Sequence, residues 1–459
     1  MHLLPGTQSK KAFELKPVSQ LVRKGWGYAR SSAAMVVGLR VAGAAFTYLN
    51  VVLLARWLNI TDYGIFTLII STVTLGGFVT RFGSDIAIVR FLGIYREKGE
   101  ASLAEGAVRA ALNFTLVASL IIAVIATVVY FAVPGLTDRP WLYAAAAFLL
   151  YPAFTQNEVL SAILRSFGVN FAALAPKDIL WRGSLLVLAL FGIWKGYESG
   201  TTLRLVIVGS GLVITALCAW QHVLQRRVRA RFGAVSEAPA YDFKAWRASV
   251  VPLWLLLIAR NLFRTADVLL VGALLSVRDA GIYFAVSRTA ELLGFFLSSL
   301  NLLVGPAVSR GHAKGDTASV QHKLDQVSLF LIASTLSAEL VLIVAGPWIL
   351  GFMGPEFRDA YIPLLILSAG QCFNVFVGSS GVVLNMTGHE KANARILVTT
   401  LVFSLGLMAL LASRYGLMGA AIASTVGMMT WNLGLWAAVR RLTPYDPSWL
   451  GVLSLIKRK

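Results

Sequence analysis

Charged residues, cysteines and histidines are all scarce in this sequence. Only 14% of its 459 residues are Asp, Glu, Lys or Arg, whereas 57% are hydrophobic. A soluble globular domain does not need so much apolar surface, so the composition excludes that class. The two cysteines, Cys218 and Cys372, both lie within apolar runs, which predicts neither a structural disulfide nor a redox motif.

Motifs that carry common enzyme chemistry are missing as well. The sequence has no phosphate-binding P-loop, and Asn393 stands where a zinc metalloprotease would place the second histidine after His389-Glu390. The segment 378–381 (GSSG) is one residue shorter than the nucleophile elbow of hydrolases. The five histidines are scattered along the chain. We therefore expect no enzyme, no metal site and no cofactor.

Long apolar runs are what the sequence has in abundance. A helix needs about 20 apolar residues to cross the roughly 30 Å hydrocarbon layer of a membrane, and about twelve runs reach this length. The sequence therefore predicts an all-α, polytopic membrane protein. The runs span residues 32–56, 65–91, 108–133, 141–164, 171–194, 203–224, 250–274, 281–308, 327–349, 362–384, 396–412 and 417–439.

Basic residues are unevenly distributed among the gaps between these runs. Most of the 41 Lys and Arg residues fall in the two termini and in alternate gaps, when Lys177 and Arg182 are counted with the gap before the fifth run. Membrane proteins keep such basic loops on the cytoplasmic side, which predicts that both termini are cytoplasmic. The same topology, with attraction to anionic membrane lipid, explains the net charge of +19 without a nucleic-acid partner.

The N-terminal residues and the central gap complete the predicted organisation. Residues 1–30 lack the apolar core and cleavage site of a secretory signal, so the first run is expected to direct insertion. The longest interior gap is rich in arginine and separates two sets of six runs. We expect a basic N-terminal segment (1–31), an N-lobe (32–224), a cytoplasmic linker (225–249), a C-lobe (250–441) and a cytoplasmic tail (442–459).

The two predicted lobes resemble each other in sequence. Residues 58–66 (LNITDYGIF) align with residues 275–283 (LSVRDAGIY) at an offset of 217 positions, and Lys98-Gly99-Glu100 aligns with Lys314-Gly315-Asp316 at an offset one residue shorter. A repeat of six spans returns the chain to its starting side. The two copies should therefore be parallel and related by an axis along the membrane normal, with a cleft between them.

These segments also resemble a known family of transporters. The resemblance covers nearly the whole chain. It is carried by residues 53–66, Gly77-Phe78, Lys98-Gly99-Glu100, 266–283, 354–357 (GPEF), 384–389 (LNMTGH) and 415–423 (YGLMGAAIA). They are similar to polysaccharide flippases, the O-antigen and exopolysaccharide transporters of the multidrug/oligosaccharidyl-lipid/polysaccharide superfamily. This resemblance implies two six-helix lobes that move an undecaprenyl-pyrophosphate-linked oligosaccharide across the bacterial inner membrane by alternating access. It also implies a polysaccharide polymerase and a chain-length regulator as partners.

Five arginines fall inside the predicted spans, where a charge facing lipid is costly. At about 3 kcal/mol each, five lipid-facing arginines would cost on the order of 15 kcal/mol, so they should face a cavity or a partner. Guanidinium groups bind phosphate oxygens in bidentate fashion, which suits a lipid pyrophosphate. The alternative is a set of buried pairs that join helices. The candidate substrate-binding residues are Arg40, Arg81, Arg260, Arg264 and Arg288.

Carboxylates inside the spans are candidates for coupling transport to an ion. Helical spacing pairs Arg81 with Asp85, Arg264 with Asp267, and Arg288 with Glu291, so a purely structural role is the alternative for these three carboxylates. Arg40 has no carboxylate within one turn. The candidate ion-coupling residues are Asp85, Glu158, Asp267, Glu291 and Glu339.

Two other functions remain open at this stage. A drug or cation antiporter of the same superfamily would have the same fold, although an excess of arginine in its spans suits cationic cargo poorly. A membrane glycosyltransferase or polysaccharide polymerase would need a sizeable outer loop with paired carboxylates, and the outer gaps are only about a dozen residues or fewer by the spans above.

Overall fold

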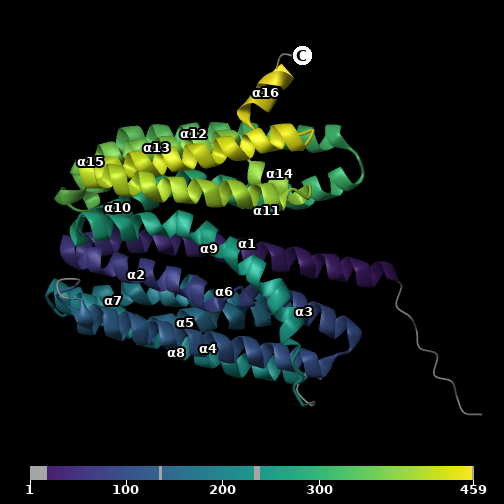
Figure 1. The fold of residues 1–459 in the computed structure, drawn as a ribbon, viewed down its shortest axis with the longest axis horizontal. Helices are drawn as coiled ribbons and strands as arrows, with labels where there is room; N and C mark the ends of the chain where they lie inside the picture. Colours follow the sequence, from purple (N-terminus) through teal and green to yellow (C-terminus); the bar gives the residue numbers. More distant parts are fainter. Residues whose placement is uncertain (1–17, 134–136, 232–237, 457–459) are drawn as a thin grey trace, which may run out of the picture.

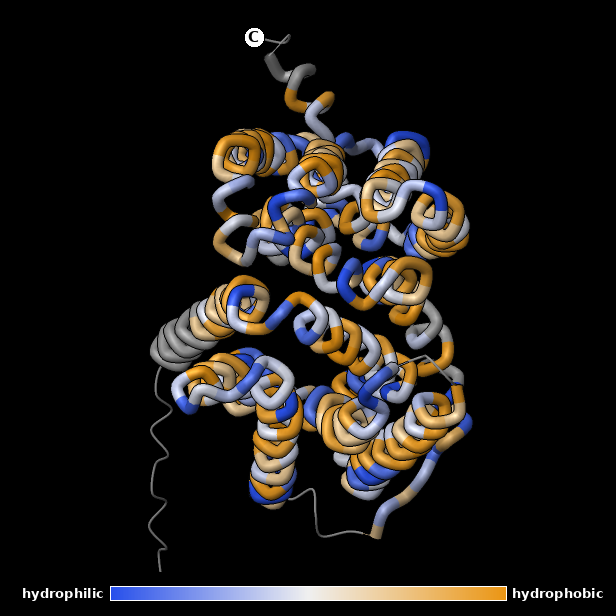
Figure 2. Tube along the Cα trace, turned by 90° about the vertical axis from the view of Figure 1, so that its left-hand side faces the viewer, coloured by the Kyte–Doolittle hydropathy of each residue, from blue (hydrophilic) through white to orange (hydrophobic). Residues whose placement is uncertain are grey.

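The computed structural model describes residues 18–133, 137–231 and 238–456. Within these ranges the chain forms helices joined by short turns, with no strand. Figure 1 shows two stacked groups of roughly parallel helices, with α1 and α9 lying where the two groups meet. In the end-on view of Figure 2, hydrophobic turns recur along the helices of both groups. The prediction of an all-α membrane protein is confirmed.

The first group contains the elements that precede the linker. They are α1 (Val18–Trp57), α2 (Ile60–Arg81), α3 (Ser84–Lys98), α4 (Ala101–Ala132), α5 (Pro140–Ser166), α6 (Asn170–Ala175), the π-helical segment η1 (Pro176–Trp181), α7 (Arg182–Trp194) and α8 (Ser199–Arg231).

The second group contains the elements that follow the linker. They are α9 (Phe243–Leu274), α10 (Val277–Glu291), the 3₁₀ turn η2 (Leu292–Gly294), α11 (Phe295–Ala313), α12 (Thr317–Met353), the 3₁₀ turn η3 (Pro355–Ala360), α13 (Tyr361–Val377), α14 (Ser380–Met386), α15 (Glu390–Leu442) and α16 (Trp449–Ile456).

Each predicted span lies on one helix or on a broken pair of helices. In the part of the chain that the structure describes, eight helical segments are long and apolar enough to cross a membrane. The last of them is α15, which carries the final two predicted spans and bends at Gly416, where φ is 59°. Three more spans lie on α5, on α6 to α7 and on α9, which carry charged or amide side chains near their middles.

The second predicted span is interrupted, which the sequence did not indicate. Phe82 (φ 49°) and Gly83 (φ 71°) both adopt left-handed conformations between α2 and α3. The break coincides with the crossing of α9, since the ring of Trp254 packs 4.2 Å from that of Phe82. A β-carbon on Gly83 would lie 3.2 Å from the Val250 carbonyl oxygen. The left-handed φ of Gly83 and the close passage of α9 therefore both favour glycine at this position.

The sequence repeat has the same local structure in both copies. Asn59 caps α2 by accepting a hydrogen bond from the Asp62 amide at 2.8 Å. Its counterpart Ser276 caps α10 in the same way, from the Asp279 amide at 3.0 Å. Such caps satisfy amides that the first helical turn leaves unpaired. The two capped helices, α2 and α10, also contact each other where Gly64 meets Gly281. The lobe boundaries themselves stay a prediction.

Candidate functional site

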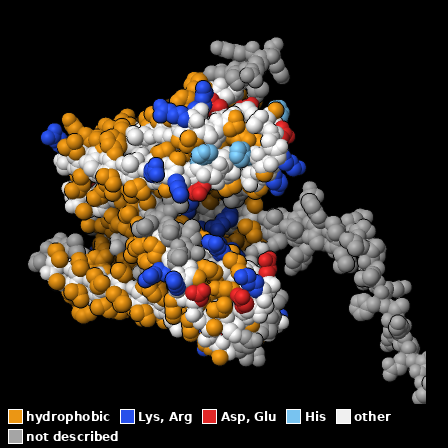
Figure 3. All heavy atoms as spheres, turned by 45° about the vertical axis from the view of Figure 1, so that its right-hand side comes forward, with side chains coloured by type: hydrophobic (Ala, Val, Ile, Leu, Met, Phe, Trp, Pro, Cys, Tyr) orange, Lys and Arg blue, Asp and Glu red, His pale blue; other side chains and the backbone are white. Residues whose placement is uncertain are grey.

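A cavity of about 810 Å³ lies among α1, α2, the η1–α7 region, α9, α10, α11, α13 and α15. Arg40, Arg260, Arg264 and Arg288 all line it. Figure 3 shows Lys and Arg side chains gathered in the hollow between the upper and lower groups of helices. Four of the five arginines predicted as substrate-binding residues are therefore brought together, from three different helices, around one space.

Arg260 and Arg264 are one helical turn apart on α9, and both are exposed to the cavity. Neither forms an ion pair within the part of the chain that the structure describes. The expected pair between Arg264 and Asp267 is not made: the Asp267 carboxylate instead accepts hydrogen bonds from the Val268 amide at 2.8 Å and the Tyr283 hydroxyl at 3.2 Å. Two guanidinium groups thus remain available to an anion.

The expected pair on α10 is present. The Arg288 guanidinium lies 2.6 Å from the Glu291 carboxylate, three residues further along the helix, and both residues line the cavity. The ring of Phe284 faces the same guanidinium at 5.0 Å. Because its charge is already partly balanced, Arg288 offers less to an anionic ligand than Arg260 or Arg264 does.

Arg40 has a carboxylate partner that helical spacing could not reveal. Asp178, on η1, lies 3.6 Å from Arg40 and 3.4 Å from Arg182. Arg182 also donates a hydrogen bond to the Gly43 carbonyl oxygen at 2.8 Å. One carboxylate is shared by two cations in this cluster, so the cavity wall here keeps a positive excess.

The sequence interpretation counted Lys177 and Arg182 with the gap before the fifth predicted span. The structure places both on one continuous helical stretch from Asn170 to Trp194, and both line the cavity together with Asp178. These three are charged cavity-lining residues that the sequence interpretation did not include among its candidates. The available signal was that three charged residues interrupt an apolar run that otherwise continues through them.

A π-helical turn determines where these charges point. Pro176 has no backbone N–H and cannot bond the carbonyl one turn earlier, so the helix widens over Pro176–Trp181. The carbonyls of Ala172 and Ala173 accept hydrogen bonds from the Gln221 side chain at 2.8 Å and the Ser161 hydroxyl at 2.5 Å. A membrane protein must satisfy such groups internally.

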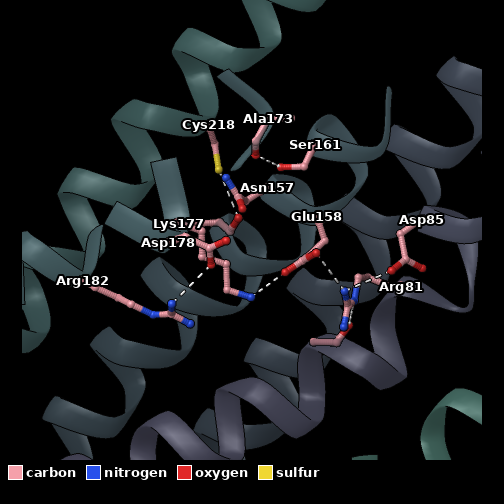
Figure 4. Close-up of polar contacts among 12 residues, drawn as sticks. Arg81, Asp85, Asn157, Glu158, Ser161, Ala173, Lys177, Asp178, Arg182 and Cys218 are labelled. Carbon is pink, nitrogen blue, oxygen red and sulfur yellow. Dashed lines mark hydrogen bonds and ion pairs between the residues drawn. The ribbon is translucent and has the colours of Figure 1, made fainter. Parts of the chain in front are cut away.

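The other predicted residues do not line the cavity. Arg81 is almost fully buried and lies 3.2 Å from Asp85 and 3.4 Å from Glu158. Glu158 also contacts Lys177 at 2.5 Å, which links this cluster to the cavity wall (Figure 4). Glu339, on α12, accepts a hydrogen bond from the Ser368 hydroxyl at 2.8 Å. Its second carboxylate oxygen is buried without a partner among the described residues.

The balance of charge around the cavity is positive. The described lining residues include six cations (Arg40, Lys177, Arg182, Arg260, Arg264 and Arg288) and three carboxylates (Asp178, Asp267 and Glu291). A concave site with an excess of positive charge attracts anions and holds their phosphate groups well. Among the residues described, no three His, Cys, Asp or Glu side chains gather closely enough to hold a metal ion.

The arrangement of helices is similar to that of solved membrane transporters. The chain matches the solved structure of the lipid II flippase MurJ in an inward closed conformation, with a TM-score of 0.69 over 92% of this chain and 91% of that one, at 14% identity. It matches an inward-facing multidrug resistance MATE family transporter of the MOP superfamily with a TM-score of 0.68, over 91% and 94% of the two chains, at 13% identity. At these identities the likeness establishes the fold.

The family follows from the sequence comparison. Residues 30–312, more than half of the chain, match the model of the family described as polysaccharide biosynthesis protein, and the chain belongs to that family. The superfamily and polysaccharide assignment suggested by the sequence motifs is confirmed. The narrower assignment to O-antigen and exopolysaccharide transporters stays a prediction.

Two archaeal relatives match parts of the chain. A probable low-salt glycan biosynthesis flippase of Haloferax volcanii is 26% identical over 164 residues, which are 35% of this chain and 34% of the relative. An uncharacterized membrane protein of Methanocaldococcus jannaschii is 27% identical over 150 residues, which are 32% of this chain and 30% of that protein. The matched stretch thus spans about a third of each relative.

Proposed function

We propose that this protein is a flippase for lipid-linked oligosaccharides in polysaccharide biosynthesis. Its substrate would be an undecaprenyl-pyrophosphate-linked oligosaccharide repeat unit, and it would move this unit from the inner to the outer leaflet of a bacterial inner membrane. The lobes 32–224 and 250–441, joined by the linker 225–249, would rock about the cavity to give alternating access. A polysaccharide polymerase and a chain-length regulator would use the product.

The observation that carries the proposal is the pair of arginines on α9 without carboxylate partners. Arg260 and Arg264 face a cavity at the depth of predicted spans, where an unneutralised charge facing lipid would be costly. A pyrophosphate supplies two adjacent anionic groups, and guanidinium groups bind phosphate oxygens through paired hydrogen bonds. Arg40 and Arg182 extend the cationic wall from the opposite group of helices.

Cationic cargo fits this cavity poorly. Six cations against three carboxylates would repel a positively charged drug, which disfavours the antiporter alternative. The carboxylates Asp267 and Glu291, which line the cavity, remain our candidates for ion coupling within a flippase. Asp85, Glu158 and Glu339 lie outside the lining, and we expect their effects on transport to be indirect.

Substitution of the two arginines tests the proposal. Arg260→Ala and Arg264→Ala together should reduce export of the surface polysaccharide by about 100-fold, since each lost charge-assisted contact is worth about 1.5 kcal/mol or more. Arg414→Ala, an exposed arginine of α15 outside the cavity, is the matched control and should leave export unchanged. Export is measured in cells that lack the native gene, with membrane insertion checked by immunoblot. Normal export by the double variant would contradict the cavity assignment, and drug resistance without any effect on polysaccharide would favour the antiporter.

A further inference from the structure

The cavity has two chemically different walls. All nine of its described charged lining residues come from elements up to Glu291, namely α1, η1, α7, α9 and α10. From Leu292 onward, the lining residues on η2, α11, α13 and α15 include none that is ionisable. This wall is a mixture of apolar side chains and neutral polar ones, the latter including Asn301, Gln371 and Asn374. A site that bound only pyrophosphate would gain little from these amide groups.

The neutral wall carries amide groups whose hydrogen-bonding capacity is only partly used within the described part of the protein. Asn301, on α11, has a buried side-chain oxygen with no hydrogen-bond partner among the described residues. On α13, Gln371 is 91% buried, and its closest polar contact is a long one, 3.5 Å from the Asn374 amide nitrogen. Gly294 leaves room for this pair, because a β-carbon there would lie 3.1 Å from the Gln371 oxygen. Buried polar groups are rarely left unpaired unless a ligand or water uses them.

An aromatic pair marks the junction between the two walls. The ring of Trp431, on α15, packs 5.1 Å from that of Phe263, which directly precedes Arg264 on α9. The Trp431 indole N–H is also buried without a partner among the described residues. An indole presents both an apolar face and a hydrogen-bond donor. This combination suits a sugar ring, which has apolar C–H faces and polar hydroxyl edges.

We propose that the neutral wall formed by Asn301, Gln371, Asn374 and Trp431 is a saccharide subsite that selects an uncharged sugar, such as a hexose or N-acetylhexosamine, next to the pyrophosphate. This inference rests on the proposed function and assigns the glycan to one wall and the phosphates to the other. Amide side chains both donate and accept hydrogen bonds, as sugar hydroxyl and acetamido groups require. A sugar carboxylate placed against this wall would meet no cation on it and would lose hydration.

Three lipid probes distinguish the contributions of the two walls to binding. They are undecaprenyl pyrophosphate without a sugar, the same lipid with one N-acetylglucosaminyl group, and the same lipid with one glucuronosyl group. Dissociation constants are measured for the full-length protein in lipid nanodiscs. The native protein should bind the N-acetylglucosaminyl lipid about tenfold more tightly than the bare lipid, and the glucuronosyl lipid no more tightly than the bare lipid.

Variants of the neutral wall should remove only the sugar preference. Asn301→Leu and Asn374→Leu should reduce the tenfold preference to about twofold, while the affinity for the bare lipid stays within about twofold. Trp431→Phe, which keeps an aromatic ring and loses the N–H, should have a smaller effect in the same direction. Ser299→Ala, an exposed residue of α11 outside the lining, is the control and should bind like the native protein.

The outcomes distinguish this inference from the proposed function. A native protein that binds the bare and glycosylated lipids equally, or variants that keep the full sugar preference, would overturn the saccharide subsite and leave the flippase proposal standing. A loss of affinity for the bare lipid in the Asn301 and Asn374 variants would also overturn it, because the substitutions would then weaken binding of the whole lipid and not of the sugar alone. If the native protein binds none of the three lipids, the proposed function fails and the subsite fails with it.

Discussion

At the scale of single residues, local pairs were predictable and distant ones were not. Helical spacing alone predicts the contacts between Arg81 and Asp85 and between Arg288 and Glu291, and both are present. The contact between Arg40 and Asp178 joins residues that are far apart in the sequence, so no spacing rule could reveal it. Helical spacing also predicts a pair between Arg264 and Asp267 that is not formed. The Asp267 carboxylate accepts a hydrogen bond from the Tyr283 hydroxyl instead.

Glu158 is the residue on which the buried charge cluster depends. It contacts Lys177 at 2.5 Å and Arg81 at 3.4 Å, and both cations are largely buried. Glu158→Gln should lower the stability by about 2 kcal/mol, because two cations lose a partner that is itself only partly exposed. The apparent melting temperature of the detergent-purified protein measures this loss. The exposed Glu97→Gln on α3 should melt like the native protein, and equal melting of both variants would refute the structural role of Glu158.

At the scale of helices, hydrophobic length predicted the elements well but not their interruptions. Each apolar run lies on helix, because length and hydropathy are enough to identify a span. The break at Phe82 depends on the crossing of α9, and the widened turn at Pro176 depends on side chains from α5 and α8. These tertiary contacts leave no pattern in the local sequence.

The π-helical turn makes a prediction about Gln221 of α8. Its side-chain N–H donates a hydrogen bond to the Ala172 carbonyl at 2.8 Å, and its side-chain oxygen accepts one from the Asn157 amide at 2.9 Å. Gln221 therefore provides hydrogen-bond partners for buried polar groups on two other helices, α6 and α5. Gln221→Leu should lower stability by about 2 kcal/mol, because two buried polar groups lose their partners. Thermal unfolding followed by tryptophan fluorescence measures the change. The exposed Gln326→Leu on α12 should have little effect, and the idea is abandoned if the two variants unfold alike.

At the scale of the whole molecule, the sequence repeat predicts the arrangement of the site better than any single motif does. Repeat positions Asn59 and Ser276 cap equivalent helices, and repeat glycines Gly64 and Gly281 lie against each other. The first helices of the two repeats, α1 and α9, then both reach the cavity with their arginines. The repeat could not reveal the charge difference between the cavity walls, because that difference is a departure from symmetry.

The contact between Gly64 and Gly281 makes the close approach of α2 and α10 testable. A β-carbon on Gly64 would lie 2.0 Å from the Val277 carbonyl oxygen, and backbone atoms cannot move aside as a flexible side chain can. Gly64→Ala should therefore push α2 and α10 apart, lowering stability by about 3 kcal/mol and reducing polysaccharide export. Gly77→Ala, on the same helix, would meet no atom within 4 Å and should be neutral or stabilising by up to about 1 kcal/mol. Melting temperature and export are measured for both variants. If Gly64→Ala melts and exports like Gly77→Ala, then α2 and α10 are not held in the close contact that Gly64 and Gly281 make in the structure.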